Sequence, residues 1–161
     1  MQWYANLKIG RKLIVAFAAV MLLATLLGLF AIRELGVVNN ASTDIANNWL
    51  PSIRTVGQIE ASLARYRISE ATHIVLTDHA EMATVEKSMA TRIDTLRKQM
   101  TAYEALISEP EEKRVYAEFQ KTLDDYLGVS RKMIALSLED QNAQAAALLR
   151  GDSSKLFRAA F

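Results

Sequence analysis

Residues 82–106 read MATVEKSMATRIDTLRKQMTAYEAL, and their apolar side chains recur on a single face of a helix. Successive apolar residues are three or four positions apart, which is the spacing of neighbours along one side of an α-helix. The residues of this stripe are Met82, Val85, Met89, Ile93, Leu96, Met100, Tyr103 and Leu106. Charged side chains occupy the opposite face, so the stretch predicts one helix of a helical bundle.

The residues after this helix predict an antiparallel neighbour. Ser108 is followed two residues on by a proline and three residues on by Glu111, the pattern of a capping box with proline in the first turn. A connection this short joins helices that lie antiparallel. The pattern of the new helix ends near residues 139–142. Its inner side is predicted to carry Val115, Phe119, Leu123, Tyr126, Met133 and Leu136.

Two further helical segments are predicted toward the C-terminus. A short helix covers residues 143–150, with Gly151 as its stop. Asp152 or Ser153 is predicted to cap a fourth helix, of which only the start is present before Phe161. We therefore expect a fragment of a longer protein, with a second membrane span and an output module beyond the fragment.

Residues 34–77, which precede the stripe, predict the first long helix of the bundle, with the far turn at residues 77–79. Pro51 is the one break in this segment and is expected to kink the helix or to mark a seam. One face, spaced in steps of three, four or seven, holds Ile45, Trp49, Ile53, Val56, Leu63, Arg67, Glu70 and Ile74.

Residues 13–32, LIVAFAAVMLLATLLGLFAI, are 20 consecutive residues without a charge. As a helix they span roughly 30 Å, the thickness of the hydrocarbon core of a bilayer. A cleaved signal peptide is the alternative, but its apolar stretch is usually shorter, and residues 30–33 (FAIR) make a poor cleavage site. The sequence therefore predicts an uncleaved transmembrane helix over residues 13–33.

The distribution of charge predicts the orientation of this helix and argues against a nucleic-acid-binding surface. Lys8, Arg11 and Lys12 precede the span without any acidic residue, which places residues 1–12 in the cytoplasm and residues 34–161 outside. After Arg33 there are 15 basic and 18 acidic residues, which argues against a nucleic-acid-binding surface.

Neither a metal site nor a catalytic site is predicted. The chain has no cysteine, and its two histidines, His73 and His79, are six positions apart, which places them on different sides of a helix. No known catalytic or phosphate-binding motif occurs, so we predict neither an enzyme nor a cofactor. The predicted fold is all-α: a transmembrane helix over residues 13–33, followed over residues 34–161 by an antiparallel four-helix bundle with a truncated fourth helix.

Two arginines near the far end of the first bundle helix are the candidate ligand contacts. Arg67 lies on the stripe with Glu70, whereas Arg65 lies on a different side of the helix. Either guanidinium can clamp the carboxylate of a small ligand bidentately. The alternatives are a buried pair between Arg67 and Glu70 and a plain solvated charge at Arg65. Ser153 is most simply an N-cap, although the amides at that helix start can also bind an anion.

The chain resembles bacterial methyl-accepting chemotaxis proteins with a four-helix-bundle sensory domain. The segments that carry the resemblance are NLKIGRKL (6–13), WLPSIR (49–54), LARYRISEATHIVLTD (63–78) and RGDSS (150–154), in addition to the span. The resemblance implies that three arginines of the first and fourth bundle helices hold an amino-acid ligand in some members. Matching LTD (76–78) places Arg65 on the first arginine and Ser153 near the contact of the fourth helix, but Glu70 and Ile74 stand where the other two arginines would be.

The resemblance further implies a ligand-sensing and signalling function at the bacterial inner membrane, with the sensory domain in the periplasm. The expected partners are a second copy of the chain through the first bundle helix, a small ligand such as an organic or amino acid, and cytoplasmic kinase-coupling proteins that act on the part beyond Phe161. Arg65, Arg67 and Ser153 are the predicted ligand contacts. Two alternatives remain open: the sensory domain of a histidine kinase or diguanylate cyclase, and a membrane-tethered scaffold without a ligand.

Overall fold

The computed structural model describes residues 8–160, and nearly all of them are helical. No β-strand occurs within this range, so the predicted all-α fold class is confirmed. The chain divides into two compact units, of which the first ends at Asn47 and the second begins at Asn48. Residues 1–7 of the predicted cytoplasmic segment, and Phe161, lie outside the described residues.

The first unit contains helix α2 (Ile9–Asp44), which includes the whole predicted span. None of its residues is buried, and it is long and apolar enough to cross a membrane. Its apolar side chains are exposed all around the helix; Phe17, Leu27 and Ile32 are examples. The Thr25 hydroxyl donates to the Met21 carbonyl four residues earlier, so this polar group is satisfied within the helix.

A π-helical turn (Ile45–Trp49) separates α2 from helix α3 (Leu50–Val75) and ends two residues before Pro51. A proline inside an α-helix removes one backbone hydrogen bond, and its ring crowds the carbonyl four residues earlier. A wider turn at this point accommodates both effects. The irregularity predicted at Pro51 is therefore present, as a change of helical hydrogen bonding.

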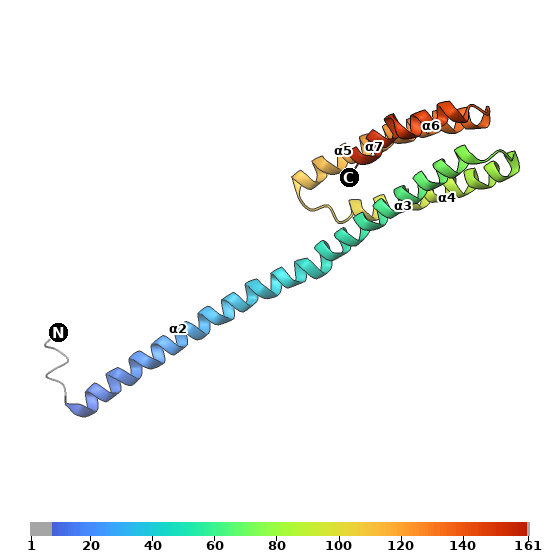
Figure 1. Ribbon diagram of the computed structural model, residues 1–161. Coiled ribbons are helices and arrows are strands. Elements are labelled where there is room, and N and C mark those ends of the chain that lie inside the picture. The colour runs from blue at the N-terminus through green and yellow to red at the C-terminus, as the bar shows by residue number, and fades with distance from the viewer. Residues whose placement is uncertain (1–7, 161) are drawn as a thin grey trace. The chain divides into compact units, whose positions relative to one another are not determined.

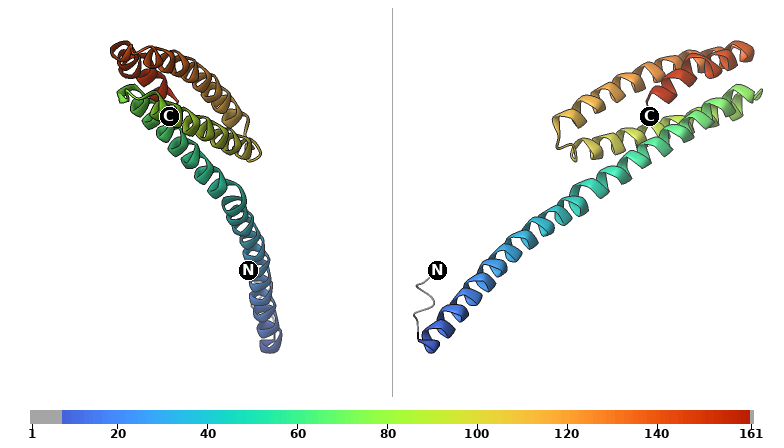
Figure 2. Two further views of the ribbon diagram at one scale, coloured as in Figure 1. Left: turned by 90° about the vertical axis from the view of Figure 1, so that its right-hand side faces the viewer. Right: turned by 60° about the vertical axis from the view of Figure 1, so that its left-hand side comes forward.

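The second unit is a bundle of helical layers. Helix α3 packs along α4 (His79–Glu104), and α5 (Pro110–Leu138) is covered by α6 (Asn142–Arg150) and α7 (Asp152–Ala159). Helix α3 also contacts α5 and α6. Figure 1 shows α3 beside α4 and the two short helices along α5, and the two further views in Figure 2 show the same pairing. The two short helices, α6 and α7, thus form the remaining layer of the bundle.

Much of the core of this unit is formed by the predicted stripes, and Ile59 and Tyr66 of α3, which no stripe included, are buried in it as well. Met82, Met89 and Leu96 of α4 are buried, and Leu63 of α3 and Tyr126 of α5 lie in one cluster with Met89 and Leu96. A second, smaller cluster lies around three buried residues, Ile74, Met133 and Ala145. Burying a large apolar side chain contributes about 1.5–3 kcal/mol, so these layers are the main source of stability.

Several residues of the predicted apolar faces are exposed near the start of α3 and of α5. Val115 was assigned to the inner side of its helix but is half-exposed, and Trp49 and Ile53 of the apolar face predicted for residues 34–77 are 62% and 66% exposed. They border an apolar groove made of two cavities of about 310 and 390 Å³. Among residues 8–160, no helix covers this groove; Ala160, which follows α7, lies at its edge.

The predicted helix caps are displaced by one or two residues. Helix α5 begins at Pro110 with Glu109 as its N-cap, and Glu112 rather than Glu111 reaches back to the backbone N–H of Ser108. Helix α7 begins at Asp152, so its N-cap is Gly151 and neither predicted residue occupies that position. Ser153 is already inside the helix.

Gly151 ends α6 and precedes α7, as the sequence predicted for the end of α6. A Cβ atom at this position would lie 3.0 Å from the Ala147 carbonyl oxygen, which is too close for ordinary contact. The glycine therefore allows the chain to turn tightly between the two short helices.

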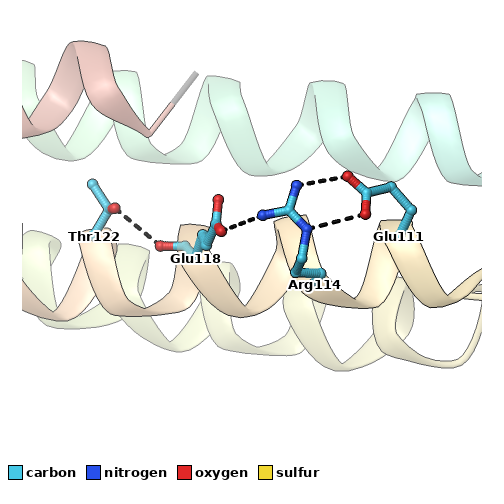
Figure 3. A network of polar contacts seen from close by, with 4 residues as sticks. All are labelled: Glu111, Arg114, Glu118 and Thr122. Atoms are coloured by element: carbon cyan, nitrogen blue, oxygen red, sulfur yellow. Dashed lines mark hydrogen bonds and ion pairs between the residues drawn. The ribbon is translucent and has the colours of Figure 1, made fainter.

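The start of α5 carries an exposed network of charges, drawn in Figure 3. Arg114 binds both oxygens of Glu111 and also pairs with Glu118, one turn further along. The hydrogen bonds from Arg114 lower the pKa of the Glu111 carboxyl. All three groups are solvated, so this network contributes little to the stability of the fold.

Candidate ligand-binding site

Helix α3 presents its two candidate arginines on different sides, as the helical spacing predicted. Arg65 is exposed, whereas Arg67 is half-buried against the helices that follow α5. With about 100° of rotation per residue, two positions along the helix turn a side chain by roughly 200°. The arginines therefore belong to different environments within one chain.

Arg67 and Ser153 meet directly. One guanidinium nitrogen of Arg67 donates to the Ser153 hydroxyl at 2.8 Å, and the other donates to the Leu149 carbonyl at 2.9 Å. The guanidinium also lies over the Phe157 ring, 5.0 Å from its centre. Ser153 is completely buried. These contacts join α3 to both short helices, because Leu149 lies in the last turn of α6 and Ser153 in the first turn of α7.

The alternative contact between Arg67 and Glu70 is not formed in the described chain. Glu70 is completely buried and accepts a hydrogen bond of 2.6 Å from the Tyr126 hydroxyl. Burial raises the pKa of the Glu70 carboxyl; the nearby Ser130 hydroxyl, the Tyr126 hydrogen bond and the Arg67 charge oppose this shift. Its other oxygen, Oε1, has no hydrogen-bond partner among residues 8–160.

Two further buried polar pairs join α3 to α5. The Tyr66 hydroxyl and the Ser130 hydroxyl are 2.9 Å apart, and His73 Nδ1 lies 2.9 Å from the Ser137 hydroxyl. Both pairs have the same sequence offset of 64 residues, which is what two parallel helices with a shared seven-residue repeat require. The pairs fix the register of α3 against α5.

The sequence interpretation did not find these pairs. His73 was considered only as a metal ligand, and Ser130 and Ser137 were not considered at all. The equal seven-residue spacing within each helix, 66 to 73 and 130 to 137, was the signal that could have revealed them. Tyr126, which was assigned to the inner side of its helix, is fully buried.

Arg65 lines a separate cavity of about 340 Å³ between α3 and α4. Its other lining residues are all polar: Ser62, Ser88, Thr91, Arg92 and Thr95. The cavity does not include Arg67 or Ser153, so the structure joins two of the three predicted ligand contacts and leaves the third apart. Glu70 and Ile74, which stand at the other two arginine positions of the resemblance, are buried in the core.

Comparison with known proteins decides the family. A family model described as a four helix bundle sensory module for signal transduction matches residues 6–161. The chain belongs to this family. The sensory-module assignment confirms the resemblance to chemoreceptors found in the sequence, and it describes a signalling rather than a catalytic role.

A curated relative agrees with this assignment. The sensory module is 20% identical over 144 residues to the "Putative sensory transducer protein YvaQ" of Bacillus subtilis (strain 168). The alignment covers 89% of this chain and 25% of that protein, so the sensory module spans about a quarter of the length of this relative. No solved structure matches the chain.

Proposed function

We propose that this sensory module lies on the outer side of a bacterial inner membrane and senses a small molecule there for a chemoreceptor. Support for the orientation comes from Lys8, Arg11 and Lys12, which precede the span and favour a cytoplasmic N-terminus. None of the residues of α2 is buried, and this supports a lipid environment for that helix, because apolar surface of this extent is unfavourable in water.

The ligand is a small carboxylate, an organic or amino acid, and Arg65 is its principal contact. Arg65 is exposed and lines a polar cavity, so its guanidinium is available to a carboxylate. Arg67 and Ser153 remain predicted contacts as well. In the described chain they bind each other, so a ligand at that position must replace the Arg67–Ser153 hydrogen bond.

A second copy of the chain assembles through α3. Ile68 and Val75 are 65% and 76% exposed on this helix, next to the exposed Arg65 and Thr72. Large apolar side chains that remain exposed beside polar ones are typical of a weak, reversible interface. A ligand that binds the dimer more tightly than the monomer strengthens the association by mass action.

The signal passes to cytoplasmic kinase-coupling proteins through the part of the receptor beyond Phe161. For this to happen the ligand must bind one arrangement of the helices more tightly than another. The Arg67 contacts join α3 to α6 and α7. A ligand bound on α3 can therefore change how α3 packs against these two helices.

The single observation that carries the proposal is the exposed Arg65 beside a polar cavity in a sensory module. The test uses the full-length receptor in membrane vesicles with its coupled kinase, and it screens organic acids and amino acids for a change in kinase activity. Replacing Arg65 by alanine should raise the half-maximal concentration of an active acid by roughly 30-fold, because a charge-assisted contact is lost.

Arg54→Ala is the matched control, since Arg54 is another exposed arginine of α3 outside the cavity. The control should respond to the acid like the wild-type receptor. A receptor whose kinase ignores every acid, or an Arg65→Ala variant that responds normally, would contradict the proposal.

A further inference from the structure

The cavity beside Arg65 has the composition of an anion site. It lies where one face of α4 meets α3, and Ser88, Thr91, Arg92 and Thr95 occupy positions i, i+3, i+4 and i+7 of that face. Helix α3 contributes Ser62 and Arg65, which are three residues apart. Side chains at these spacings share one side of a helix, so six polar groups converge from two packed helices.

The charges of this cavity are unbalanced. Among the described residues, no aspartate or glutamate lines it, although acidic residues are nearly as frequent as basic ones in the chain. No ion pair engages Arg65 or Arg92 within residues 8–160. Two guanidinium groups with neutral hydroxyl neighbours therefore leave a local excess of positive charge, which favours an anion.

Arg92 also has a hydrogen-bond donor without a partner in the described part of the chain, which is an observation independent of the charge balance. Its Nε–H is buried, and it has no hydrogen-bond acceptor among the described residues. A buried donor without a partner is rare in folded proteins and costs free energy. A guanidinium presents its N–H groups as a planar fork, which matches the paired oxygens of a carboxylate or phosphate. The Nε nitrogen of Arg92 has almost no accessible surface, so it reaches an oxyanion in the cavity only if the Arg92 side chain turns.

The second arginine of this cavity belongs to α4 and not to α3. On α3 itself, the positions of the resemblance that would carry further arginines are Glu70 and Ile74, and both are buried against α5. Neither can contact a ligand at the surface of the bundle. Arg92 lines the same cavity as Arg65 and so supplies the second guanidinium from the neighbouring helix.

We propose that Arg65 and Arg92, with the hydroxyls of α3 and α4, form a complete oxyanion site within one subunit that takes a small doubly charged anion. This inference rests on the proposed ligand-sensing function and makes it more specific. A dicarboxylate and inorganic phosphate share the required chemistry, since each presents two negative charges and several acceptor oxygens. Thr91 and Thr95 donate to backbone carbonyls, so their hydroxyl protons are already used, and the serine hydroxyls of the cavity are the ones left to donate to the anion.

The experiment is isothermal titration of the full-length protein in lipid nanodiscs at constant ionic strength. The probes are succinate, inorganic phosphate and, as the monovalent comparison, acetate. Succinate or phosphate should bind, and acetate should bind at least about tenfold more weakly because only one charge is neutralised. Which of the two dianions binds more tightly identifies the physiological class.

Variants of the two arginines test whether both of them contact the anion. Arg65→Ala and Arg92→Ala should each weaken binding by roughly 30-fold or more. Arg97→Ala is the matched control, because Arg97 is an exposed arginine of α4 that lines a different cavity, and it should bind like wild type. Arg92→Gln, which keeps a hydrogen-bond donor and removes the charge, replaces Arg92→Ala if the alanine variant fails to fold.

The outcomes separate this inference from the proposed function. Loss of binding in Arg65→Ala together with normal binding in the Arg92 variants overturns the site between α3 and α4 and leaves Arg65 as a ligand contact. Wild-type protein that binds neither succinate nor phosphate also overturns the site. The kinase assay with the wider set of acids then decides independently whether the module senses a small acid at all.

Discussion

The hydrogen bond between Tyr126 and Glu70 offers the sharpest test of the bundle core. The Tyr126 hydroxyl donates to Glu70 Oε2 at 2.6 Å, both residues are completely buried, and Glu70 Oε1 has no partner among residues 8–160. The change Tyr126→Phe keeps the ring in the apolar cluster and removes only the hydroxyl. It leaves the carboxyl without this donor.

The magnitude follows from the burial of the acceptor. A buried polar group that loses its partner costs about 1–3 kcal/mol, and the upper end applies when the group carries charge. For a domain of this size the midpoint of thermal unfolding changes by roughly 4 °C per kcal/mol, so we expect a decrease of about 4–12 °C. The ring packing should be unchanged, because Tyr126 contacts Tyr66 and Phe157 edge-on or tilted through its ring.

A double mutant isolates the pair. Glu70→Met places an apolar side chain of similar length in the same space, so Tyr126→Phe should cost far less in that background than in the wild type. The coupling energy between the two positions should be about 1–3 kcal/mol.

The pH dependence gives an independent check on Glu70. Burial holds its pKa in the folded state above the ordinary value of 4.5, so the folded state keeps the proton over a range in which the unfolded chain has lost it. The contribution of this group is fully present below pH 4.5 and is lost as the pH rises through the folded pKa. Glu70→Gln should remove this loss and raise the stability near neutral pH relative to the wild type.

The assay is thermal unfolding in detergent micelles, followed by far-UV circular dichroism at several pH values from 4.5 upward. The reasoning is refuted if Tyr126→Phe unfolds at the wild-type temperature, or if it costs as much with Met at position 70 as with Glu. A wild-type chain whose stability rises with pH relative to Glu70→Gln would refute the assigned direction of the pKa shift.

Two further predictions concern the short helices. Arg67→Met should lower the free energy of unfolding by about 1.5–3 kcal/mol, measured by chemical denaturation, because the Ser153 hydroxyl and the Leu149 carbonyl lose a charged donor; the exposed Arg158 gives the control change, Arg158→Met, which should cost far less. Gly151→Ala should destabilise by roughly 1 kcal/mol, because its Cβ would lie 3.0 Å from the Ala147 carbonyl oxygen, and a variant as stable as wild type would show that the turn relaxes freely.

The helices could be predicted from the sequence because their signals are local. The stripe of α4 repeats at helical spacing over seven turns, and the span of α2 is defined by length and absence of charge. The separation of Arg65 from Arg67 follows from the rotation per residue alone. None of these inferences needs to know which helix packs against which.

The caps and the buried polar pairs could not be predicted, because they depend on neighbours distant in sequence. Ser153 looks like an N-cap, but its hydroxyl accepts from Arg67, 86 positions away, and the helix begins before it. Glu70 looks like a partner for Arg67, but Tyr126 reaches it from α5. The local sequence pattern does not determine which distant residue becomes the hydrogen-bond partner.

The second arginine of the proposed anion site was missed for the same reason. Arg92 belongs to the polar face of α4, to which the sequence analysis assigned charged side chains but no site. Its proximity to Arg65 depends on the register between α3 and α4, and no periodicity within one helix specifies that register. The exposed Trp49 and Ile53 show the converse case, in which an apolar stripe is not evidence of burial.

The orientation of the sensory module is the claim on which the proposed function depends most. The chain has no cysteine, so a single introduced thiol can report its side of the membrane. Thr77→Cys places the thiol at the exposed turn between α3 and α4, and Gly10→Cys places it before the span, where a side chain meets no other atom within 4 Å.

Labelling of intact spheroplasts with a membrane-impermeant maleimide is therefore the most direct measurement. The account predicts that Thr77→Cys is labelled in intact spheroplasts and that Gly10→Cys is labelled only after lysis. Labelling of Gly10→Cys but not Thr77→Cys before lysis would place the bundle in the cytoplasm and contradict the account.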